Sequence, residues 1–552
     1  MSDRQQVAVV TGGGGGIGAA IAQELGRSGW FVVTLDPLVT LDGTEQLPQP
    51  EETTAGRILA AGGSARASSA SVTDGPALRI LFQELVDEHG GLDAVVNVAG
   101  ITRQSYFAQG TEADFVALLS VHLGGYLNVL NAALPLMAEA GHGRILGVTS
   151  GSGWRAADAG GYSAAKRAVA ALTWHLGRYA PHGVTVNAIS PIASTRMVAA
   201  ALERARQAGR AGGGGGLSLD SMPGPEDLAP LGAYLVGRDA AWCSGQVLFA
   251  GGPEVAVVDQ PRLIEVVRSA DVKSLEAVLR AVVPRALLAA EAGQATEGGS
   301  NPRFGPIFDE TAPAQLASSD VKSCAIVSDR PELAASVTAA LEARSITCIP
   351  VEPAEGFDGA AAALRAVAEV AGPIDAVVAA FAGQEAPAAA GPEWRRVLAD
   401  HQGVTDQLHT DAAWARAAAD YASGADRPVR LVTMTDARSP AGRSRAQAAA
   451  QLARVAAGGT HGRLTAFAVG LEVSAGDAAH ASGELVGYLL ANPETAALAG
   501  AELAVGDGWI GLRSHPRPIG TITYGGPAVP SWLDASLREI VGATGHSATE
   551  SP

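Results

Sequence analysis

The chain has 552 residues, which is more than one ordinary domain holds, so two or three domains are expected. Hydrophobic residues make up 47% and charged residues 17% of the chain, and this composition excludes a protein that is disordered throughout. The formal net charge of −17 argues against a surface for nucleic acid or for an anionic membrane, so we expect neither as a partner.

The three cysteines (Cys243, Cys324 and Cys348) are widely spaced and match no zinc site or disulfide framework, so no metal is expected. We expect them to be small buried side chains in a reducing compartment. The N-terminal residues lack the hydrophobic region of a signal peptide. The most apolar long stretch, 361–383, is interrupted by charged residues, so no membrane span is expected there. These observations predict a soluble, cytoplasmic protein.

The first half of the chain alternates apolar runs with helical patterns. Repeated strand–helix units of this kind predict a doubly wound parallel sheet of the Rossmann-like α/β class. The predicted strands are 7–10, 31–35, 94–98, 144–148, 185–189 and 246–249, and the predicted helices are 18–28, 76–89, 112–140 and 162–179.

A glycine-rich loop, Thr11–Gly18, directly follows the first predicted strand and opens the first predicted helix. Gly12 permits a tight turn, Gly16 lets the backbone approach a pyrophosphate, and Gly18 allows the helix to pack closely on the strand. The helix then turns its free N–H groups toward the phosphates. The setting between a strand and a helix predicts a dinucleotide site.

Asp36 ends the second predicted strand. A carboxylate at this place accepts hydrogen bonds from the adenosine ribose and repels a 2′-phosphate. No lysine or arginine follows in residues 37–40, so the sequence predicts NAD rather than NADP as the cofactor. A solvated aspartate at a strand end is the alternative interpretation.

Tyr162 and Lys166 stand four residues apart, so they share one face of a helix. A nearby ammonium group and the nicotinamide cation would stabilise the phenolate and lower the pKa of Tyr162 from its usual value of about 10. Tyr162 can then exchange a proton with a substrate hydroxyl or carbonyl, while Ser150, at the end of a strand, holds the substrate oxygen. The combination predicts a catalytic site for hydride transfer.

With these motifs in order, residues 5–255 resemble the short-chain dehydrogenase/reductase family. The motifs that carry the resemblance are the Thr11–Gly18 loop, Asn97-Val-Ala-Gly100, Ser150, Tyr162 with Lys166, Asn187-Ala-Ile-Ser-Pro191, and Gly245-Gln with Gly251-Gly252. The resemblance implies that Asn97 steadies the sheet beside the adenosine and that Lys166 also binds the nicotinamide ribose. The other cofactor-binding positions that it implies are Ile17, Val72 near the adenine, Ala99, Gly100, and Pro191, Ile192 and Thr195 around the carboxamide.

Three positions depart from the family pattern. His122 stands where many relatives have an asparagine that relays protons, and a histidine can relay them too, or can merely fill space beneath the lysine. Ile192 replaces the usual glycine after Pro191. Ser71 stands where an acidic residue or an asparagine is common, which weakens the adenine assignment of Val72.

The stretches around His122 and Met197 are similar to the (3R)-hydroxyacyl-CoA dehydrogenase units of multifunctional β-oxidation enzymes. A substrate lid is expected after Met197. Its Arg204, Arg206 and Arg210 would meet a CoA phosphate or form a solvated helix face, and the glycine run 212–216 follows them.

The second half of the chain repeats the first half, 1–258, in degraded form. Residues 259–318 are predicted to be a connector in which Pro284 kinks or divides a helix. In residues 319–515 the strand-like segments then recur in the same order, which predicts a duplicated domain. A tail at 516–552 is expected to pack across a domain or subunit boundary.

The duplicated domain has lost the residues that carry chemistry. It has neither the glycine loop nor the Tyr-Lys pair, and Ala379 stands at the place of Asn97, although His401 keeps the place of His122. We therefore expect a degenerate, cofactor-free pseudoenzyme domain, with an independent binding site as the alternative. Its alanine-rich helix suits close packing, so the halves are expected to form an internal pseudo-dimer, and two chains a homodimer with four domains.

The sequence thus predicts an NAD-dependent oxidoreductase that interconverts a secondary alcohol and a ketone, with Tyr162 as general acid and base. A 3-hydroxyacyl-CoA is the leading candidate for its small-molecule substrate. A hydroxysteroid or another bulky cyclic alcohol is the alternative substrate, and a scaffold that only binds the cofactor is the non-enzymatic alternative.

Overall fold

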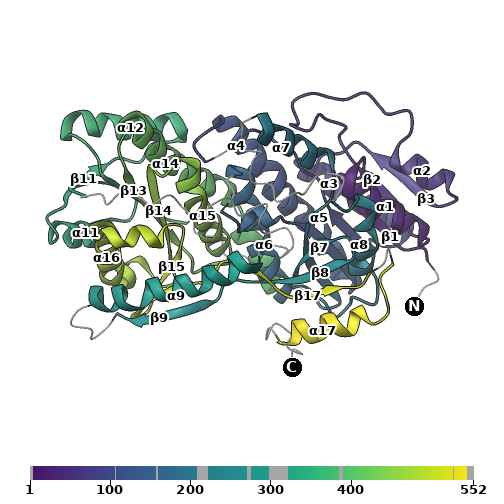
Figure 1. The fold of residues 1–552 in the computed structure, drawn as a ribbon. Coiled ribbons are helices and arrows are strands. Elements are labelled where there is room, and N and C mark those ends of the chain that lie inside the picture. Colours follow the sequence, from purple (N-terminus) through teal and green to yellow (C-terminus); the bar gives the residue numbers. More distant parts are fainter. Residues whose placement is uncertain are drawn as a thin grey trace.

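The computed structural model describes residues 4–105, 107–156, 159–207, 222–269, 275–297, 321–383, 390–525 and 528–543. It contains two α/β units side by side, each built on one large sheet (Figure 1). Residues of the first half form the unit at the right of Figure 1, and residues of the second half form most of the unit at the left. The predicted pair of tandem Rossmann-like domains is therefore confirmed.

The first sheet has nine strands in the order β17-β8-β7-β6-β5-β4-β1-β2-β3. The strands from β3 to β7 pair in parallel, and β8 and β17 are added antiparallel at one edge. The strands are β1 (Val7–Thr11), β2 (Phe31–Leu35), β3 (Ser64–Ser68), β4 (Ala94–Asn97), β5 (Gly143–Val148), β6 (Val184–Pro191), β7 (Val247–Gly251), β8 (Glu254–Asp259) and β17 (Arg517–Thr523).

The helices of the first domain cover both faces of this sheet, with α3, α5 and α6 in one hydrophobic core and α1 and α8 in another. The helical elements are α1 (Gly16–Arg27), α2 (Thr54–Ala60), α3 (Gly75–His89), α4 (Glu112–Leu119), a π-helical turn (Ser120–Gly124), α5 (Gly125–Ala140), a 3₁₀ turn (Gly151–Gly153), α6 (Gly160–Arg178), α7 (Arg196–Gln207), a second 3₁₀ turn (Pro225–Asp227) and α8 (Ala229–Val236).

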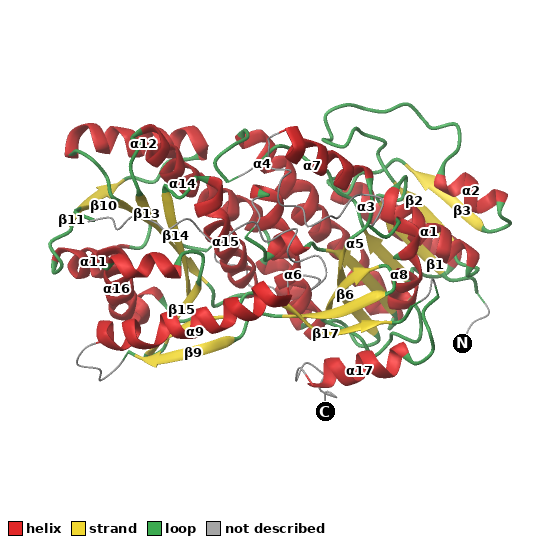
Figure 2. Cartoon of the chain, viewed as in Figure 1, coloured by secondary structure: helices red, strands yellow, loops and turns green. Residues whose placement is uncertain are grey.

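The second sheet has eight strands in the order β11-β10-β12-β13-β14-β15-β16-β9. Figure 2 shows α12 and α14 on one face and α11 and α16 on the other. The elements are β9 (Leu263–Arg268), α9 (Leu275–Glu297), β10 (Ser323–Ser328), α11 (Pro331–Glu342), β11 (Thr347–Val351), α12 (Gly356–Ala371), β12 (Ala376–Phe381), α13 (Glu393–Asp400), α14 (Val404–Gly424), β13 (Val429–Asp436), α15 (Pro440–Gly459), β14 (Leu464–Leu471), α16 (Ala475–Ala491), a 3₁₀ turn (Pro493–Leu498), β15 (Glu502–Gly506) and β16 (Trp509–Arg513); α17 (Leu533–Ala543) follows β17.

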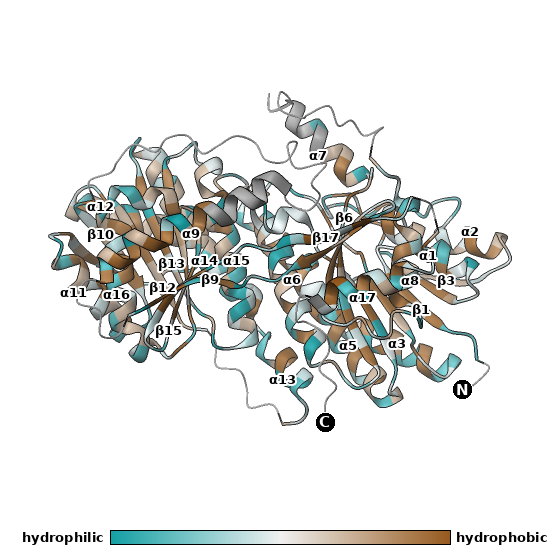
Figure 3. Cartoon of the chain, turned by 60° about the horizontal axis from the view of Figure 1, so that its bottom comes forward, coloured by the Kyte–Doolittle hydropathy of each residue, from teal (hydrophilic) through white to brown (hydrophobic). Residues whose placement is uncertain are grey.

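Local sequence explains why several of these elements begin and end where they do. The apolar run of β1 is buried along its whole length, which is typical of a central parallel strand. Helix α3 begins after Asp74, whose side chain accepts a hydrogen bond from the amide of Ala77, and it ends at Gly90, which has a left-handed conformation (φ 76°). Figure 3 shows that hydrophobic strands lie inside each domain, in agreement with the burial of β1.

The structure differs from the sequence predictions at three places. The helix expected at 112–140 is interrupted at Ser120–Gly124 by the π-helical turn, which contains His122. Strand β3 was not predicted, because its sequence Ser-Ala-Arg-Ala-Ser lacks the apolar run of a buried strand. Pro284 does not divide helix α9, which continues from Leu275 to Glu297.

The stretch 112–140 has the length and the mean hydropathy, 1.4, of a membrane-spanning segment, as far as the described residues were searched. Within the 18-residue window that has this hydropathy, 56% of the residues are buried inside the protein. Leu119, Leu123 and Leu127 all belong to the hydrophobic core that the two domains share, so this stretch is a core element of the fold.

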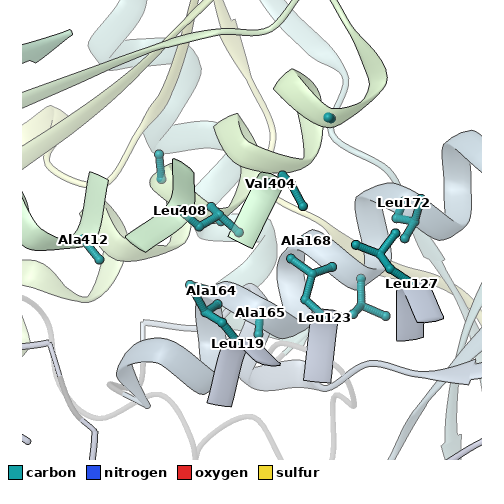
Figure 4. Packing of buried hydrophobic residues seen from close by; sticks show 14 of the residues in the cluster. Leu119, Leu123, Leu127, Ala164, Ala165, Ala168, Leu172, Val404, Leu408 and Ala412 are labelled. Carbon is teal, nitrogen blue, oxygen red and sulfur yellow. The ribbon is translucent and has the colours of Figure 1, made fainter. Parts of the chain in front are cut away.

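The two domains pack through helices that carry or precede the Tyr-Lys pair. Helix α6 packs against α15, and α4 and the π-helical turn pack against α14. Figure 4 shows this contact, with Leu119, Leu123, Leu127, Ala164, Ala165, Ala168 and Leu172 of the first domain and Val404, Leu408 and Ala412 of the second. One hydrophobic core continues through both domains, so the predicted internal pairing of the two halves is confirmed.

The two sheets exchange their edge strands. After β8 the chain crosses to the second sheet, where β9 pairs antiparallel with β16. After β16 it crosses back, and β17 pairs antiparallel with β8. The two crossing segments bind each other, because the amide of Ser514 donates to the carbonyl of Arg262 (2.8 Å) and the amide of Arg262 donates to Oγ of Ser514 (3.1 Å).

This exchange corrects two predicted segments. The expected connector, 259–318, contains β9, so that part of it belongs to the second sheet. The expected tail, 516–552, contains β17 in the first sheet and α17, whose Asp534 accepts hydrogen bonds from Tyr234 (2.7 Å) and Trp242 (2.6 Å) of the first domain. The described part of the tail thus returns to the first domain and forms part of it.

Candidate active site

The glycine loop approaches the neighbouring strand end so closely that side chains are excluded from it. A Cβ atom on Gly12 would lie 2.9 Å from the amide nitrogen of Ala99, and one on Gly18 would lie 2.3 Å from the carbonyl oxygen of Gly12. Gly12 and Gly16 also have positive φ angles of 63° and 54°, which favour glycine. Ile17 and Gly18 stand in the first turn of α1, whose unpaired amides face this loop. The loop therefore has the shape that a pyrophosphate needs.

Thr11, at the end of β1, joins the loop to the adjacent strand β4. Its Oγ1 donates to Oδ1 of Asn97 (2.9 Å) and accepts from the amide of Ala99 (3.1 Å). Asn97 is buried, so it fixes the separation of β1 and β4 at the point where a nucleotide would enter. This position agrees with the role expected for Asn97.

Asp36 lies at the mouth of the same loop. Its carboxylate accepts hydrogen bonds from the amides of Gly14 (3.0 Å) and Leu38 (2.9 Å), so it is oriented by two backbone donors. Sequence reasoning missed Arg196 as a site residue; it begins α7, which follows the carboxyl end of β6. Its guanidinium lies over Gly15, where a Cβ would be 3.1 Å from Nη2. The loop thus has both an anionic and a cationic neighbour.

Ser150, Tyr162 and Lys166 come together at the end of β5. Ser150 caps the 3₁₀ turn Gly151–Gly153, accepting a hydrogen bond from the amide of Ser152 (3.3 Å), and it also makes a hydrogen bond with Tyr162. Nζ of Lys166 lies 5.7 Å from the centre of the Tyr162 ring and donates to the carbonyl of Val148 (2.7 Å). The three residues that the sequence predicts to be catalytic therefore lie together.

The electrostatics of the pair differ from expectation. Burial raises the pKa of Tyr162, and only the hydrogen bond with Ser150 acts in the lowering direction. Loss of water therefore dominates in the protein without a cofactor, whereas the lowering expected from the sequence depended on the nicotinamide cation as well as on the ammonium of Lys166. Burial also lowers the pKa of Lys166 to about 7.

His122 lies beneath this pair, in the π-helical turn. Its Nε2 is 2.8 Å from the carbonyl oxygen of Ile101, which can only accept, so Nε2 carries the hydrogen. Burial, followed by the nearby charge of Lys166, holds the pKa of His122 well below its usual range. The ring also lies against Gly100, where a Cβ would be 2.6 Å from Cε1. His122 is thus neutral, with Nδ1 free to accept.

The remaining predicted residues lie around the ends of the strands. The amide of Ile192, after Pro191, donates to the carbonyl of Ala250 (2.8 Å), and Thr195 caps α7, with Oγ1 accepting from the amide of Val198 (3.3 Å). Val72 is buried, and its carbonyl accepts from the side chain of Asn128 in α5 (2.9 Å).

The lid residues can be placed only in part. Arg204 and Arg206 fall within α7, whereas Arg210 and the glycine run 212–216 lie outside the described residues. No group of three metal-binding side chains occurs among the residues that the structure describes.

The corresponding region of the second domain is built differently. Asp93 accepts from the first amide of β1, and Asp375 accepts from the first amide of β10. The two aspartates therefore occupy equivalent positions, which places Ala379 at the position of Asn97. Arg330, in the loop after β10, pairs with Asp436 (3.4 Å) at the end of β13. An ion pair therefore stands between the two strand ends where the first domain has its glycine loop and Ser150.

Comparison with known proteins follows this division of the chain. The family model described as short chain dehydrogenase matches residues 6–206. An acetoacetyl-CoA reductase of Cupriavidus necator is 31% identical over 244 residues, which are 44% of this chain and 94% of that protein. A hydroxyacyl-CoA dehydrogenase of Mycobacterium tuberculosis is 34% identical over 276 residues, which are 47% of this chain and 81% of that protein.

The two-domain arrangement also has a counterpart among solved structures. The crystal structure of the N-domain of a bacterial malonyl-CoA reductase with NADP matches with a TM-score of 0.63 and covers 91% of this chain and 97% of its own. Because the two sequences are 16% identical, the match shows a shared fold.

Proposed function

Because the chain belongs to the short-chain dehydrogenase/reductase family, we propose that it is an NAD-dependent enzyme that interconverts the hydroxyl and keto groups of a 3-hydroxyacyl-CoA. The observation that carries this proposal is the convergence of Ser150, Tyr162 and Lys166 beside a loop shaped for a pyrophosphate. The names of two relatives, which act on acetoacetyl-CoA and on a hydroxyacyl-CoA, support the substrate class.

The choice of NAD rests on Asp36. Its carboxylate is held by two backbone amides at the mouth of the glycine loop. There it can accept from ribose hydroxyls, and it would repel a 2′-phosphate. The cation of Arg196 lies over Gly15 of the same loop, and it can bind the phosphates of either cofactor.

The chain's own residues supply the proton chemistry, and a bound nicotinamide would supply the hydride in reduction and accept it in oxidation. In the reductive direction the phenol of Tyr162 gives its proton to the carbonyl oxygen, while Ser150 holds the same oxygen. In the oxidative direction the phenolate takes the proton back from the hydroxyl. The ammonium of Lys166 and, behind it, Nδ1 of His122 provide the groups through which this proton is exchanged with solvent.

The second domain is proposed to bind no cofactor and to perform no catalysis. Ala379 removes the amide side chain that joins the strands in the first domain, and the Arg330–Asp436 ion pair stands where phosphates and Ser150 would lie. Assembly of two chains into a homodimer remains a separate proposal, which sedimentation analysis tests.

The proposal is tested with a panel of 3-ketoacyl-CoA and 3-hydroxyacyl-CoA thioesters, steroids and small alcohols, followed by NADH and NADPH absorbance. We expect turnover of the thioesters with NAD(H), and a loss of about 10²- to 10⁴-fold in kcat for Tyr162→Phe, because general acid–base catalysis contributes that much. NADH binding to this variant should be unchanged. Turnover of free alcohols but of no thioester would contradict the substrate class, and full activity of Tyr162→Phe would contradict the mechanism.

A further inference from the structure

A glutamine of the second domain reaches into the active site of the first. Gln451 lies in the middle of α15 and is completely buried. Its Nε2 donates to the carbonyl of Ser152 (2.9 Å) and to the carbonyl of Arg155 (2.8 Å). Both hydrogens of one amide group are therefore used on the segment that directly follows Ser150.

That segment determines where Ser150 points. The amide of Gly153 donates to the carbonyl of Ser150 (2.9 Å), and the amide of Arg155 donates to the carbonyl of Gly151 (3.2 Å), so residues 150–155 form one tight turn. Oγ of Ser150 closes the turn by accepting from the amide of Ser152, and the same hydroxyl is bonded to Tyr162. A shift of the turn would therefore move the hydroxyl away from the phenol.

The same glutamine is itself held from the catalytic helix. Its Oε1 accepts from Nη1 of Arg167 (3.2 Å), and Arg167 directly follows Lys166 in α6. Arg167 is completely buried and is fixed from the second domain by Gln447 (2.9 Å) and Glu502 (2.8 Å). Gln451 thus joins the two elements that carry the catalytic residues, the Ser150 turn and helix α6.

We propose that Gln451 is a positioning residue for catalysis, which acts from the second domain by holding the Ser150 turn at its distance from Tyr162. The inference rests on the proposed function, because it assigns Ser150 and Tyr162 their roles. It gives the second domain a part in the reaction of the first, which Gln451 exerts through the backbone of Ser152 and Arg155.

A pair of neighbouring glutamines provides the test. Gln447 stands one helical turn before Gln451, is buried at the same interface and also binds Arg167, but its Nε2 donates to Glu502 instead of to the Ser150 turn. We therefore compare Gln451→Leu with Gln447→Leu in the full chain. A third variant, Gln451→Glu, keeps the size and the acceptor for Arg167 but has no hydrogen to donate to the two carbonyls.

Two readouts separate positioning from stability. Hydrogen–deuterium exchange of the backbone amides at 151–155 should become faster in both Gln451 variants and stay as in the wild type in Gln447→Leu. With the thioester substrate, kcat should fall about ten- to hundredfold in both Gln451 variants, because a misplacement of about 1 Å has this effect. KM for NADH should be unchanged, and kcat of Gln447→Leu should stay within about twofold of the wild type.

The pH profile adds a third readout. The hydrogen bond with Ser150 acts to lower the pKa of Tyr162. If the Gln451 variants misalign this hydrogen bond, the pKa of Tyr162 should rise. The part of the kcat/KM profile that reports ionisation of the phenol should then move to higher pH. Unchanged exchange at 151–155 in the Gln451 variants, or equal losses of kcat in the Gln447 and Gln451 variants, would overturn the inference. If exchange at 151–155 is faster in the Gln451 variants than in the wild type, but the wild type turns over no thioester, the proposed function has failed while the contact of Gln451 with the Ser150 turn stands.

Discussion

The ring of His122 stands edge-on to the ring of Tyr162, with centroids 4.9 Å apart and planes at 84°. Because Nε2 is bound to the carbonyl of Ile101, the edge that remains for proton exchange is Nδ1, which is buried and has no hydrogen-bond partner. A buried imidazole nitrogen without a partner is unfavourable unless a water molecule or a moving proton uses it. This geometry favours the relay interpretation of His122 over a role as filler.

Replacing His122 tests that interpretation. We expect His122→Leu to lower kcat by about tenfold or more, since the relay is lost while the packing volume is kept. His122→Asn should retain most of the activity, because an asparagine can accept a hydrogen bond at the same place. Steady-state rates across pH 6–10 provide the measurement. If both variants behave alike, the ring only fills space.

The cofactor preference depends on Asp36. We expect Asp36→Ala to weaken NAD binding by about ten- to hundredfold, the effect of losing a charged hydrogen bond of about 1.5–3 kcal/mol, and to improve NADP binding by removing a repulsive charge. Titration calorimetry with both cofactors measures this. Asp42 lies six residues after Asp36, in the segment between β2 and α2, and is held by Thr40 and Thr44. Asp42→Ala is therefore the matched control and should leave the cofactor preference unchanged.

The ion pair between Arg167 and Glu502 should govern the stability of the domain interface. Both side chains are buried, and burial raises the pKa of Glu502. Arg167→Met leaves a buried carboxylate unpaired, so we expect the free energy of unfolding to fall by about 3–5 kcal/mol.

The double variant Arg167→Met with Glu502→Leu should recover most of that loss, because no buried charge is then left unpaired. Denaturant unfolding of the full chain, followed by fluorescence, compares the variants. A double variant that is less stable than Arg167→Met would contradict this account of the pair.

Lys166 should make stability depend on pH. Burial lowers its pKa in the folded protein from the usual 10.5 to about 7. Between these two values the unfolded chain holds a proton that the folded chain has released, so the free energy of unfolding rises with pH; below about pH 7 both states hold the proton and this contribution is constant. Lys166→Met should remove it. We expect the melting temperature of the wild type to increase relative to that of Lys166→Met between pH 7 and pH 9. A difference between the two melting temperatures that does not change with pH would contradict the lowered pKa of Lys166.

The parts of the fold that could be predicted are those whose signal is local. The buried apolar runs of β1 and β2 and the glycine loop between β1 and α1 are contiguous in sequence, and so are Tyr162 and Lys166. By contrast, β3 is polar and is recognisable only by its pairing with β2. The interruption at His122 has no proline to mark it in the sequence. The π-helical turn instead packs against α6 and α14, which are distant in the sequence.

The parts of the site that could not be predicted come from distant segments. Arg196 reaches the glycine loop from the segment after β6, which β5 and β4 separate from β1 in the sheet, and Gln451 reaches Ser152 across 299 positions of the chain. Nothing in the neighbouring residues of either side chain indicates the partner. The direction of the pKa of Tyr162 was also beyond the sequence, because it depends on how deeply the phenol is buried.

Because β9 and β17 cross between the domains, each half of the chain provides an edge strand to the sheet of the other half. A chain divided between residues 297 and 321 would produce two fragments. The first would contain β9, which belongs to the second sheet, and the second would contain β17, which belongs to the first sheet. Each fragment alone would expose an unpaired strand edge of its own sheet and carry a strand without a sheet. The two pieces are therefore suited to mutual donor-strand complementation, in which neither is complete until both have been made.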